Sequence, residues 1–206
     1  MTRRHPIAEK DPLEIRLSGS GGQGLVLAGV ILAEAALLDG KNVVQTQSYG
    51  PEARLGASRS EVILSKRKIA YPQVLKPDVL LCMSQDSFRK FIGKTREGAV
   101  AILDATNIEF DEGEIPQKVE VFPLPLTATA AALGSKVVAN VVALGAMNAL
   151  LGLVSPDSLR RAVVGRVPAR FRELNERALE EGVKLGAAGE ERAGVAYGSS
   201  SIGKSV

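Results

Sequence analysis

The chain has few of the residues on which redox centres, zinc sites and secreted folds depend. Its 206 residues include no Trp, one Cys and one His, and only 4% are aromatic. A lone Cys82 cannot form an internal disulfide, and without a Cys/His cluster it cannot hold an iron–sulfur cluster or a structural zinc, so we predict no metal site. The same count predicts a cytoplasmic, reducing setting in which Cys82 is a small buried residue.

Strong charge and membrane-spanning runs are also missing. The net charge is +3, and no basic stripe is interleaved with aromatic residues, so nucleic acid is not an expected partner. Residues 1–12 are polar and lack the apolar core of a secretory signal. The uncharged apolar run 137–154 contains Asn140 and Asn148, and we predict a buried helix there, with no membrane contact.

What is present suffices for one domain. Hydrophobic residues make up 45% of the chain, and with so few aromatics the core must consist of Val, Leu, Ile and Ala. Such a core suits helices packed on a parallel sheet. We predict a flexible leader at 1–12, a folded domain at 13–186, and a disordered tail at 187–206 that is rich in Gly, Ala and Ser.

Strand and helix patterns alternate along the domain. Expected strands lie at 14–18, 42–47, 60–64, 79–83, 99–103 and 119–122. Expected helices lie at 23–38, after a Ser84 cap, at 127–151 as one helix or two joined near Gly134, at 156–164 and at 169–185. This order predicts an α/β fold, a Rossmann-like open, mostly parallel sheet flanked by helices. Ligands bind such sheets beyond the carboxyl ends of the strands.

A glycine-rich segment follows the first expected strand. Gly19, Ser20, Gly21, Gly22, Gln23 and Gly24 match G-x-G-x-x-G between a strand and a helix. Glycines allow backbone amides to approach an anion, and the start of a helix attracts phosphate. The acidic residue that binds the ribose of NAD is missing from 44–48, and no Gly-Lys-Ser/Thr of a P-loop follows. Phosphate binding and a purely structural turn both remain open.

A second dense loop spans 48–59. It contains Tyr49, Arg54, Ser58 and Arg59 besides the Gly and Pro that a simple connection needs. Arginine presents planar donors to phosphate or carboxylate, which favours a ligand or subunit contact. The alternative is that Glu52 and Arg54 are surface charges and that Arg59 begins a strand.

Together the two loops resemble the gamma subunit of 2-oxoacid:ferredoxin oxidoreductases, most closely the 2-oxoglutarate (KorC-like) type. The resemblance covers about residues 14–186. It continues through the segments 71–72, 76–78, 84–85, 132–145, 167–168 and 174–175. Leu55 departs from the family pattern, which usually has Gly there.

The resemblance implies a function for the whole enzyme. Such enzymes decarboxylate a 2-oxoacid oxidatively, transfer the acyl group to coenzyme A and reduce ferredoxin. It implies that thiamine diphosphate, magnesium and iron–sulfur clusters belong to partner alpha, beta and ferredoxin-like subunits. It also implies that this chain holds the nucleotide end of coenzyme A and has no catalytic residue. The only histidine, His5, lies in the predicted leader and is not expected to be catalytic.

For individual residues, the resemblance implies that Gly19 to Gly24 contact coenzyme A phosphates, with Gln23 capping or donating at the helix start. It places Tyr49, Arg54, Ser58 and Arg59 at the active-site edge or a subunit interface. Three alternatives stay open: a gamma-type subunit for indolepyruvate, pyruvate or 2-oxoisovalerate; a stand-alone nucleotide-binding reductase; and an assembly subunit whose glycine turn is structural only.

Overall fold

The computed structural model describes residues 5–48 and 57–196. In that part of the chain six strands form one sheet in the order β2-β3-β1-β4-β5-β6. The strands are β1 (Leu13–Ser20), β2 (Asn42–Ser48), β3 (Ala57–Ser65), β4 (Val79–Cys82), β5 (Val100–Asp104) and β6 (Glu120–Leu124).

The sheet is mostly parallel, as predicted. Strands β1, β4, β5 and β6 are parallel neighbours, whereas β3 runs antiparallel to both β1 and β2. Strands β4 and β5 are buried along their whole length, because both of their faces are covered. This explains why their sequences are continuous apolar runs without alternation.

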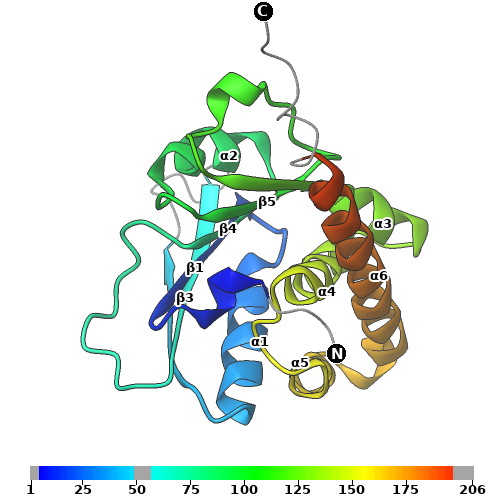
Figure 1. Ribbon diagram of the computed structural model, residues 1–206. Coiled ribbons are helices and arrows are strands. Elements are labelled where there is room, and N and C mark those ends of the chain that lie inside the picture. Colours follow the sequence, from blue (N-terminus) through cyan, green and yellow to red (C-terminus); the bar gives the residue numbers. More distant parts are fainter. Residues whose placement is uncertain (1–4, 49–56, 197–206) are drawn as a thin grey trace, which may run out of the picture.

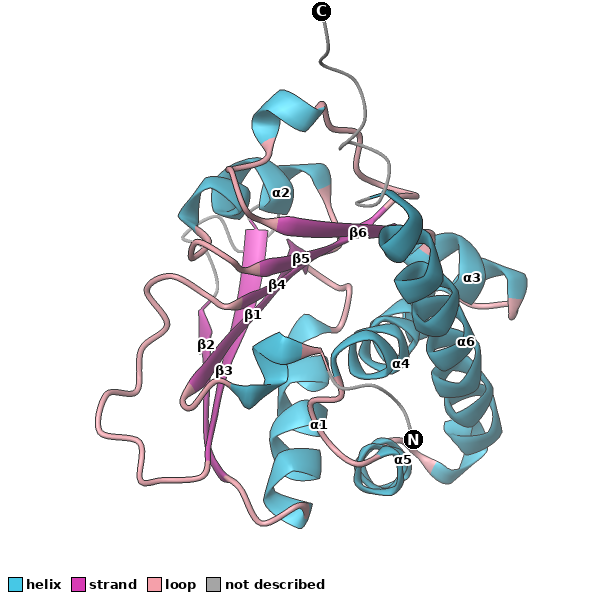
Figure 2. Ribbon diagram, in the orientation of Figure 1, coloured by secondary structure: helices cyan, strands magenta, loops and turns pink. Residues whose placement is uncertain are grey.

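Helices cover both faces of the sheet unequally (Figures 1 and 2). The larger apolar cluster joins one face to α1 (Leu25–Leu38), α4 (Ala139–Leu151), α5 (Pro156–Arg166) and α6 (Arg172–Ala196). The smaller cluster joins the other face to α2 (Gln85–Phe91) through Phe88 and Phe91. The remaining helix is α3 (Leu126–Ala132), and the 3₁₀ turns are η1 (Pro6–Glu9), η2 (Ile92–Lys94), η3 (Glu112–Glu114), η4 (Lys136–Val138) and η5 (Ala169–Phe171).

Two local predictions are confirmed. The Ser84 side chain accepts a hydrogen bond from the Ser87 amide at 3.3 Å and caps α2. The segment 127–151 forms two helices, α3 and α4, which separate near Gly134. Gly134 has a φ of 95°, a conformation that favours glycine.

Both ends of the domain extend beyond the predicted boundaries. Residues 5–12, predicted as a flexible leader, are packed: Ile7 is 5% exposed within the core, and His5 Nε2 lies 2.9 Å from Glu120 Oε2. At the other end α6 continues to Ala196, so the predicted disordered tail begins inside a helix. Residues 1–4 and 197–206 lie outside the described part. Ile7 could pack because a single apolar side chain in a polar segment suffices to anchor one turn.

Glycines let α4 and α6 pack backbone against backbone. A Cβ atom at Gly145 would lie 2.5 Å from the Leu179 carbonyl oxygen, and one at Gly182 would collide with the Val142 carbonyl. Gly186 meets the Ala146 carbonyl in the same way. The two helices therefore have no room for a side chain at these positions. Further along α6, a Cβ atom at Gly189 would lie 3.1 Å from Leu124 Cδ2 of β6.

We expect Gly182→Ala to lower the free energy of unfolding by about 1–3 kcal/mol, because the new methyl group overpacks a backbone contact. Gly165→Ala in α5 is the matched control, since nothing lies within 4 Å of its Cβ position. The control should gain up to about 1 kcal/mol by restricting the unfolded chain. Urea denaturation of the full chain measures both, and equal stability of the two variants would contradict the close helix contact.

Candidate functional site

The glycine segment divides between a strand and a turn. Gly19 and Ser20 belong to β1, which corrects the prediction that all six residues form a turn. The turn itself contains Gly22 and Gly24, with φ values of 89° and 73°. Gly24 stands at the N-cap position of α1, and no side chain caps the helix. The first amides of α1 are therefore left without intrahelical partners at this end.

Gln23 fastens the turn to the sheet and does not cap the helix. Its Oε1 accepts from the Ser20 amide at 2.7 Å, and its Nε2 donates to the Met83 carbonyl at 2.9 Å. Gly19 makes room for this bridge, because a Cβ there would collide with Gln23 Oε1 and lie 2.8 Å from Leu25 Cδ1. The predicted role of Gln23 is thus corrected: both ends of its amide are used inside the protein.

Asn140 of α4 supports the turn from the opposite side. Its Nδ2 donates to the Gly24 carbonyl at 3.1 Å. A Cβ at Gly24 would lie 2.6 Å from the same nitrogen. The third glycine of the motif therefore permits close packing against α4, besides its left-handed conformation.

The second predicted loop is described only in part. Tyr49 and Arg54 lie outside the described residues, whereas Ser58 and Arg59 belong to β3. Ser58 Oγ donates to the Gly19 carbonyl at 3.2 Å, so the structure does bring Ser58 to the glycine segment. Arg59 Nε lies 3.8 Å from Glu61 Oε1. Arg59 is thus part of a strand, as the alternative interpretation had it.

Glu61 is held by a second arginine inside the protein. Arg16 Nε donates to Glu61 Oε1 at 2.8 Å, and its Nη2 donates to the Val74 carbonyl at 2.7 Å. Both side chains are buried, and the Arg16 guanidinium lies over the Phe91 ring, 5.1 Å from its centroid. Burial of this pair requires the extra hydrogen bonds that Arg16 makes. Its role is structural, because it connects three segments of the fold.

A buried carboxylate organises the neighbouring strand ends. Asp104, the last residue of β5, accepts from Thr127 Oγ1 at 2.5 Å and from Asn107 Nδ2 at 2.7 Å. The backbone amides of Thr106 and Thr127 also donate to it, both at 3.2 Å. Asn107 Nδ2 lies 3.4 Å from the Met83 carbonyl that Gln23 also contacts. The glycine turn and the Asp104 cluster are therefore one connected network.

This network borders a cavity of about 310 Å³. Its lining consists of Gly22, Gln23, Asn107, Thr127, Lys136, Val137 and Ala139. Lys136 is exposed and forms no salt bridge with a described residue. Next to it lies a more apolar cavity of about 330 Å³, which shares Gly22 and Val137 and extends along Leu27 and Phe171. An anionic group beside a flatter apolar group would fit this pair of cavities.

The lining can bind but offers little for acid–base chemistry. In the 310 Å³ cavity, Lys136 is the one lining side chain that carries a charge at neutral pH. The nearby Cys82 is buried, which raises the pKa of its thiol to about 11 and leaves it protonated. Among the described residues no three His, Cys, Asp or Glu side chains gather in a way that could hold a metal ion.

Sequence reasoning missed Asn107, Thr127, Lys136 and Asn140. Asp104 directly follows the strand expected at 99–103, and Asn107 follows it three residues later. Lys136 and Asn140 lie within the segment 132–145 that contributed to the family resemblance. No local pattern connects these residues, since Asn107 follows β5, Thr127 lies at the start of α3, Lys136 begins η4 and Asn140 lies at the start of α4.

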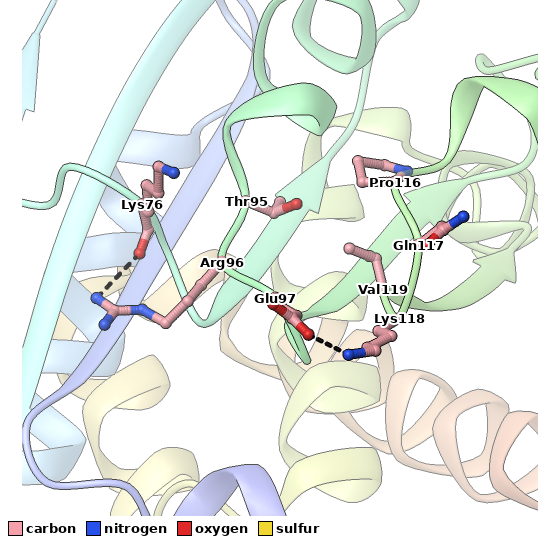
Figure 3. Close-up of a pocket in the computed structure, with 8 residues that line it drawn as sticks. All are labelled: Lys76, Thr95, Arg96, Glu97, Pro116, Gln117, Lys118 and Val119. Carbon is pink, nitrogen blue, oxygen red and sulfur yellow. Dashed lines mark hydrogen bonds and ion pairs between the residues drawn. The ribbon is translucent and has the colours of Figure 1, made fainter.

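A separate cavity of about 330 Å³ lies where β4, β5 and β6 begin, at the opposite edge of the sheet (Figure 3). Its lining includes Lys76, Arg96 and Lys118. It is remote from the glycine turn, because the cavity and the turn lie at opposite ends of the parallel strands. As for membranes, none of the helices in 5–48 and 57–196 is long and apolar enough to span a bilayer.

Comparisons with known proteins identify the family to which the chain belongs. The family model described as Pyruvate ferredoxin/flavodoxin oxidoreductase matches residues 14–185. The 2-oxoglutarate synthase subunit KorC of Methanocaldococcus jannaschii is 45% identical over 84% of this chain and 92% of its own length.

Solved structures show the same fold. The gamma subunit of a keto/oxoacid ferredoxin oxidoreductase from Geobacter sulfurreducens has a TM-score of 0.78 and 42% identity, over 87% of this chain and 99% of that one. A 2-oxoglutarate:ferredoxin oxidoreductase from Magnetococcus marinus, solved with 2-oxoglutarate, coenzyme A and succinyl-CoA bound, has a TM-score of 0.78 and 27% identity, over 87% of this chain and 32% of that one. The chain belongs to the pyruvate ferredoxin/flavodoxin oxidoreductase family, as a gamma-type subunit of a 2-oxoacid:ferredoxin oxidoreductase.

Proposed function

We propose that this chain serves a 2-oxoglutarate:ferredoxin oxidoreductase by holding the phosphate groups of coenzyme A at the glycine turn. The observation that carries the proposal is the cavity of Gly22, Asn107, Thr127 and Lys136, which combines hydrogen-bonding groups with a lysine that forms no salt bridge with a described residue. Relatives support 2-oxoglutarate as the substrate, since three proteins that are 40–45% identical to this chain are 2-oxoglutarate synthase subunits.

The chemistry of the two cavities suits coenzyme A. Phosphate binds well to a lysine and to backbone amides at the start of a helix, and α1 begins directly after the turn. The apolar cavity along Leu27 and Phe171 would take an uncharged part of the same molecule. Gly22 has open space at its Cβ position, so the backbone there is accessible to a ligand.

In this proposal the chain binds and orients, and its partners carry out the reaction. Thiamine diphosphate, magnesium and iron–sulfur clusters belong to the alpha, beta and ferredoxin-like subunits, and ferredoxin accepts the electrons. Asp104 holds Asn107 and Thr127 in place through the hydrogen bonds it accepts. We place the enzyme in the cytoplasm, where a lone reduced cysteine such as Cys82 is usual.

Lys136→Gln should raise the KM for coenzyme A about tenfold in the assembled enzyme and leave kcat nearly unchanged. Removing one charge-assisted contact to phosphate costs on the order of 1.5 kcal/mol or more, which corresponds to that factor. Steady-state kinetics with saturating 2-oxoacid measures the change. Lys184→Gln on α6 is the control and should leave the KM unchanged; an unchanged KM in Lys136→Gln would remove Lys136 from the site.

Gly22→Ala tests the turn separately from folding. Both Gly22 and Gly98 have a positive φ, 89° and 74°, and nothing lies within 4 Å of either Cβ position. Both alanine variants should lose about 1–2 kcal/mol of stability through backbone strain. Only Gly22→Ala should raise the KM for coenzyme A, because its methyl group enters the ligand cavity. A structural turn predicts the same KM in both variants.

The first test of the whole proposal is co-purification from the native host. Mass spectrometry of the tagged full chain should find a thiamine-diphosphate-binding subunit pair and a ferredoxin-like subunit. The complex should then use 2-oxoglutarate with a kcat/KM at least about tenfold above that for pyruvate, 2-oxoisovalerate or indolepyruvate, a difference of about 1.4 kcal/mol. A preference for another 2-oxoacid would overturn the substrate. A solitary chain that binds NAD(P) would overturn the subunit role.

A further inference from the structure

A long irregular connection joins β3 to β4 at the edge of the sheet opposite the glycine turn. It comprises residues 66–78, which we call the basic loop, and it lies along the left side of the molecule in Figure 1. A connection of 13 residues without regular structure is uncommon in a compact domain, and such loops usually have a function. None of the roles described above requires it.

The basic loop is held firmly although it contains no helix or strand. The buried Arg16 donates to the Val74 carbonyl at 2.7 Å, in the middle of the loop. At its end, the Arg96 amide donates to the Pro77 carbonyl at 3.1 Å, and Arg96 Nη2 donates to the Lys76 carbonyl at 3.3 Å. A loop fixed in this way loses little conformational entropy when it binds a partner.

The side chains that this backbone presents are apolar and basic. Tyr71 is 58% exposed and Leu75 is 68% exposed, although both are large. Lys66, Arg67, Lys68 and Lys76 are exposed beside them, and neither Lys68 nor Lys76 forms a salt bridge with a described residue. Large exposed side chains within a charged rim are typical of protein interfaces, in which tyrosine is often a central contact.

Positive charge is concentrated in this part of the molecule. The basic loop, residues 66–78, contains four Lys and Arg against one Asp, a net charge of +3 that equals the net charge of the whole chain. The fold brings the loop beside the cavity of Lys76, Thr95, Gln117 and Lys118 (Figure 3). In that cavity Arg96 contacts the Lys76 carbonyl, and Glu97 pairs with Lys118. The Lys76 ammonium forms no salt bridge with either of them or with another described residue.

The family membership supplies a reason for such a surface. In the Magnetococcus marinus relative, the part similar to this chain is about one third, 32%, of a longer chain. A covalent connection therefore retains that part within its enzyme. The Geobacter sulfurreducens gamma subunit, by contrast, is a chain of which 99% is similar to this one, so a subunit of that kind is held in its enzyme by a non-covalent interface.

We propose that the basic loop docks this chain onto an acidic surface of a partner subunit of the same oxidoreductase. Tyr71 and Leu75 enter apolar depressions of the partner, and Lys68 and Lys76 pair with its carboxylates. The opposite edge of the sheet, with the glycine turn and Lys136, stays free for coenzyme A. The proposal rests on the family membership but not on the coenzyme A site.

The test uses the complex reconstituted from the full chain and its co-purified partner subunits. Two variants change the loop: Leu75→Ser, and the double variant Lys68→Glu/Lys76→Glu. Matched controls are Leu37→Ser, at a leucine that is 58% exposed against 68% for Leu75, and Arg161→Glu/Lys184→Glu. Sedimentation or light scattering gives the dissociation constant at two salt concentrations, and urea denaturation confirms that each isolated variant is folded.

We expect both loop variants to raise the dissociation constant at least tenfold, while the controls change it less than twofold. Added salt should weaken the wild-type complex and have little further effect on the charge-reversed one. At saturating subunit concentration the KM for coenzyme A should be unchanged, which separates docking from ligand binding. An unchanged dissociation constant in the folded loop variants would overturn the proposal. Binding of RNA or anionic vesicles by the loop would not rescue it. A wild-type chain that joins no other subunit would overturn it together with the proposed function.

Discussion

The carbonyl oxygen of Met83 joins the two halves of the candidate binding site. It lies directly after β4 and accepts from Gln23 on one side and from Asn107 on the other. Through Gln23 it connects to Ser20 and the glycine turn, and through Asn107 to the buried carboxylate of Asp104. The ends of three parallel strands are thus tied together by side-chain hydrogen bonds, where the backbone ladder no longer reaches.

This arrangement explains why the glycines occur where they do. Because Gly19 has no Cβ atom, the side-chain amide of Gln23 can approach it, and Asn140 can approach Gly24 for the same reason. Gly22 is different, because the space beside it is open. The turn therefore combines two glycines that serve internal packing with one that leaves its backbone accessible, and the cavity lies beside that one.

The two edges of the sheet differ in their chemistry. The 310 Å³ cavity at the glycine turn is lined by one cation, Lys136, beside neutral hydrogen-bonding groups, which suits a small anionic ligand. The opposite edge carries many cations beside exposed Tyr71 and Leu75, which suits a protein surface. In the function proposed above, this subunit contributes binding and positioning, and its partners carry out the reaction.

Much of this could be predicted from local patterns, and the exceptions depend on contacts between segments that are distant in the sequence. The sequence by itself determined the α/β class, the strand-to-helix glycine segment, the Ser84 cap and the poverty in catalytic groups, because hydrophobic period and positive-φ residues depend on near neighbours. It misjudged residues 5–12 and 187–196, where Ile7 and a glycine-lined helix gain their stability only from distant contacts. Tertiary structure alone decided that Gln23, Asn107, Thr127 and Lys136 share one cavity. They lie on separate elements, and only the strand order, with β4 between β1 and β5, brings their ends together.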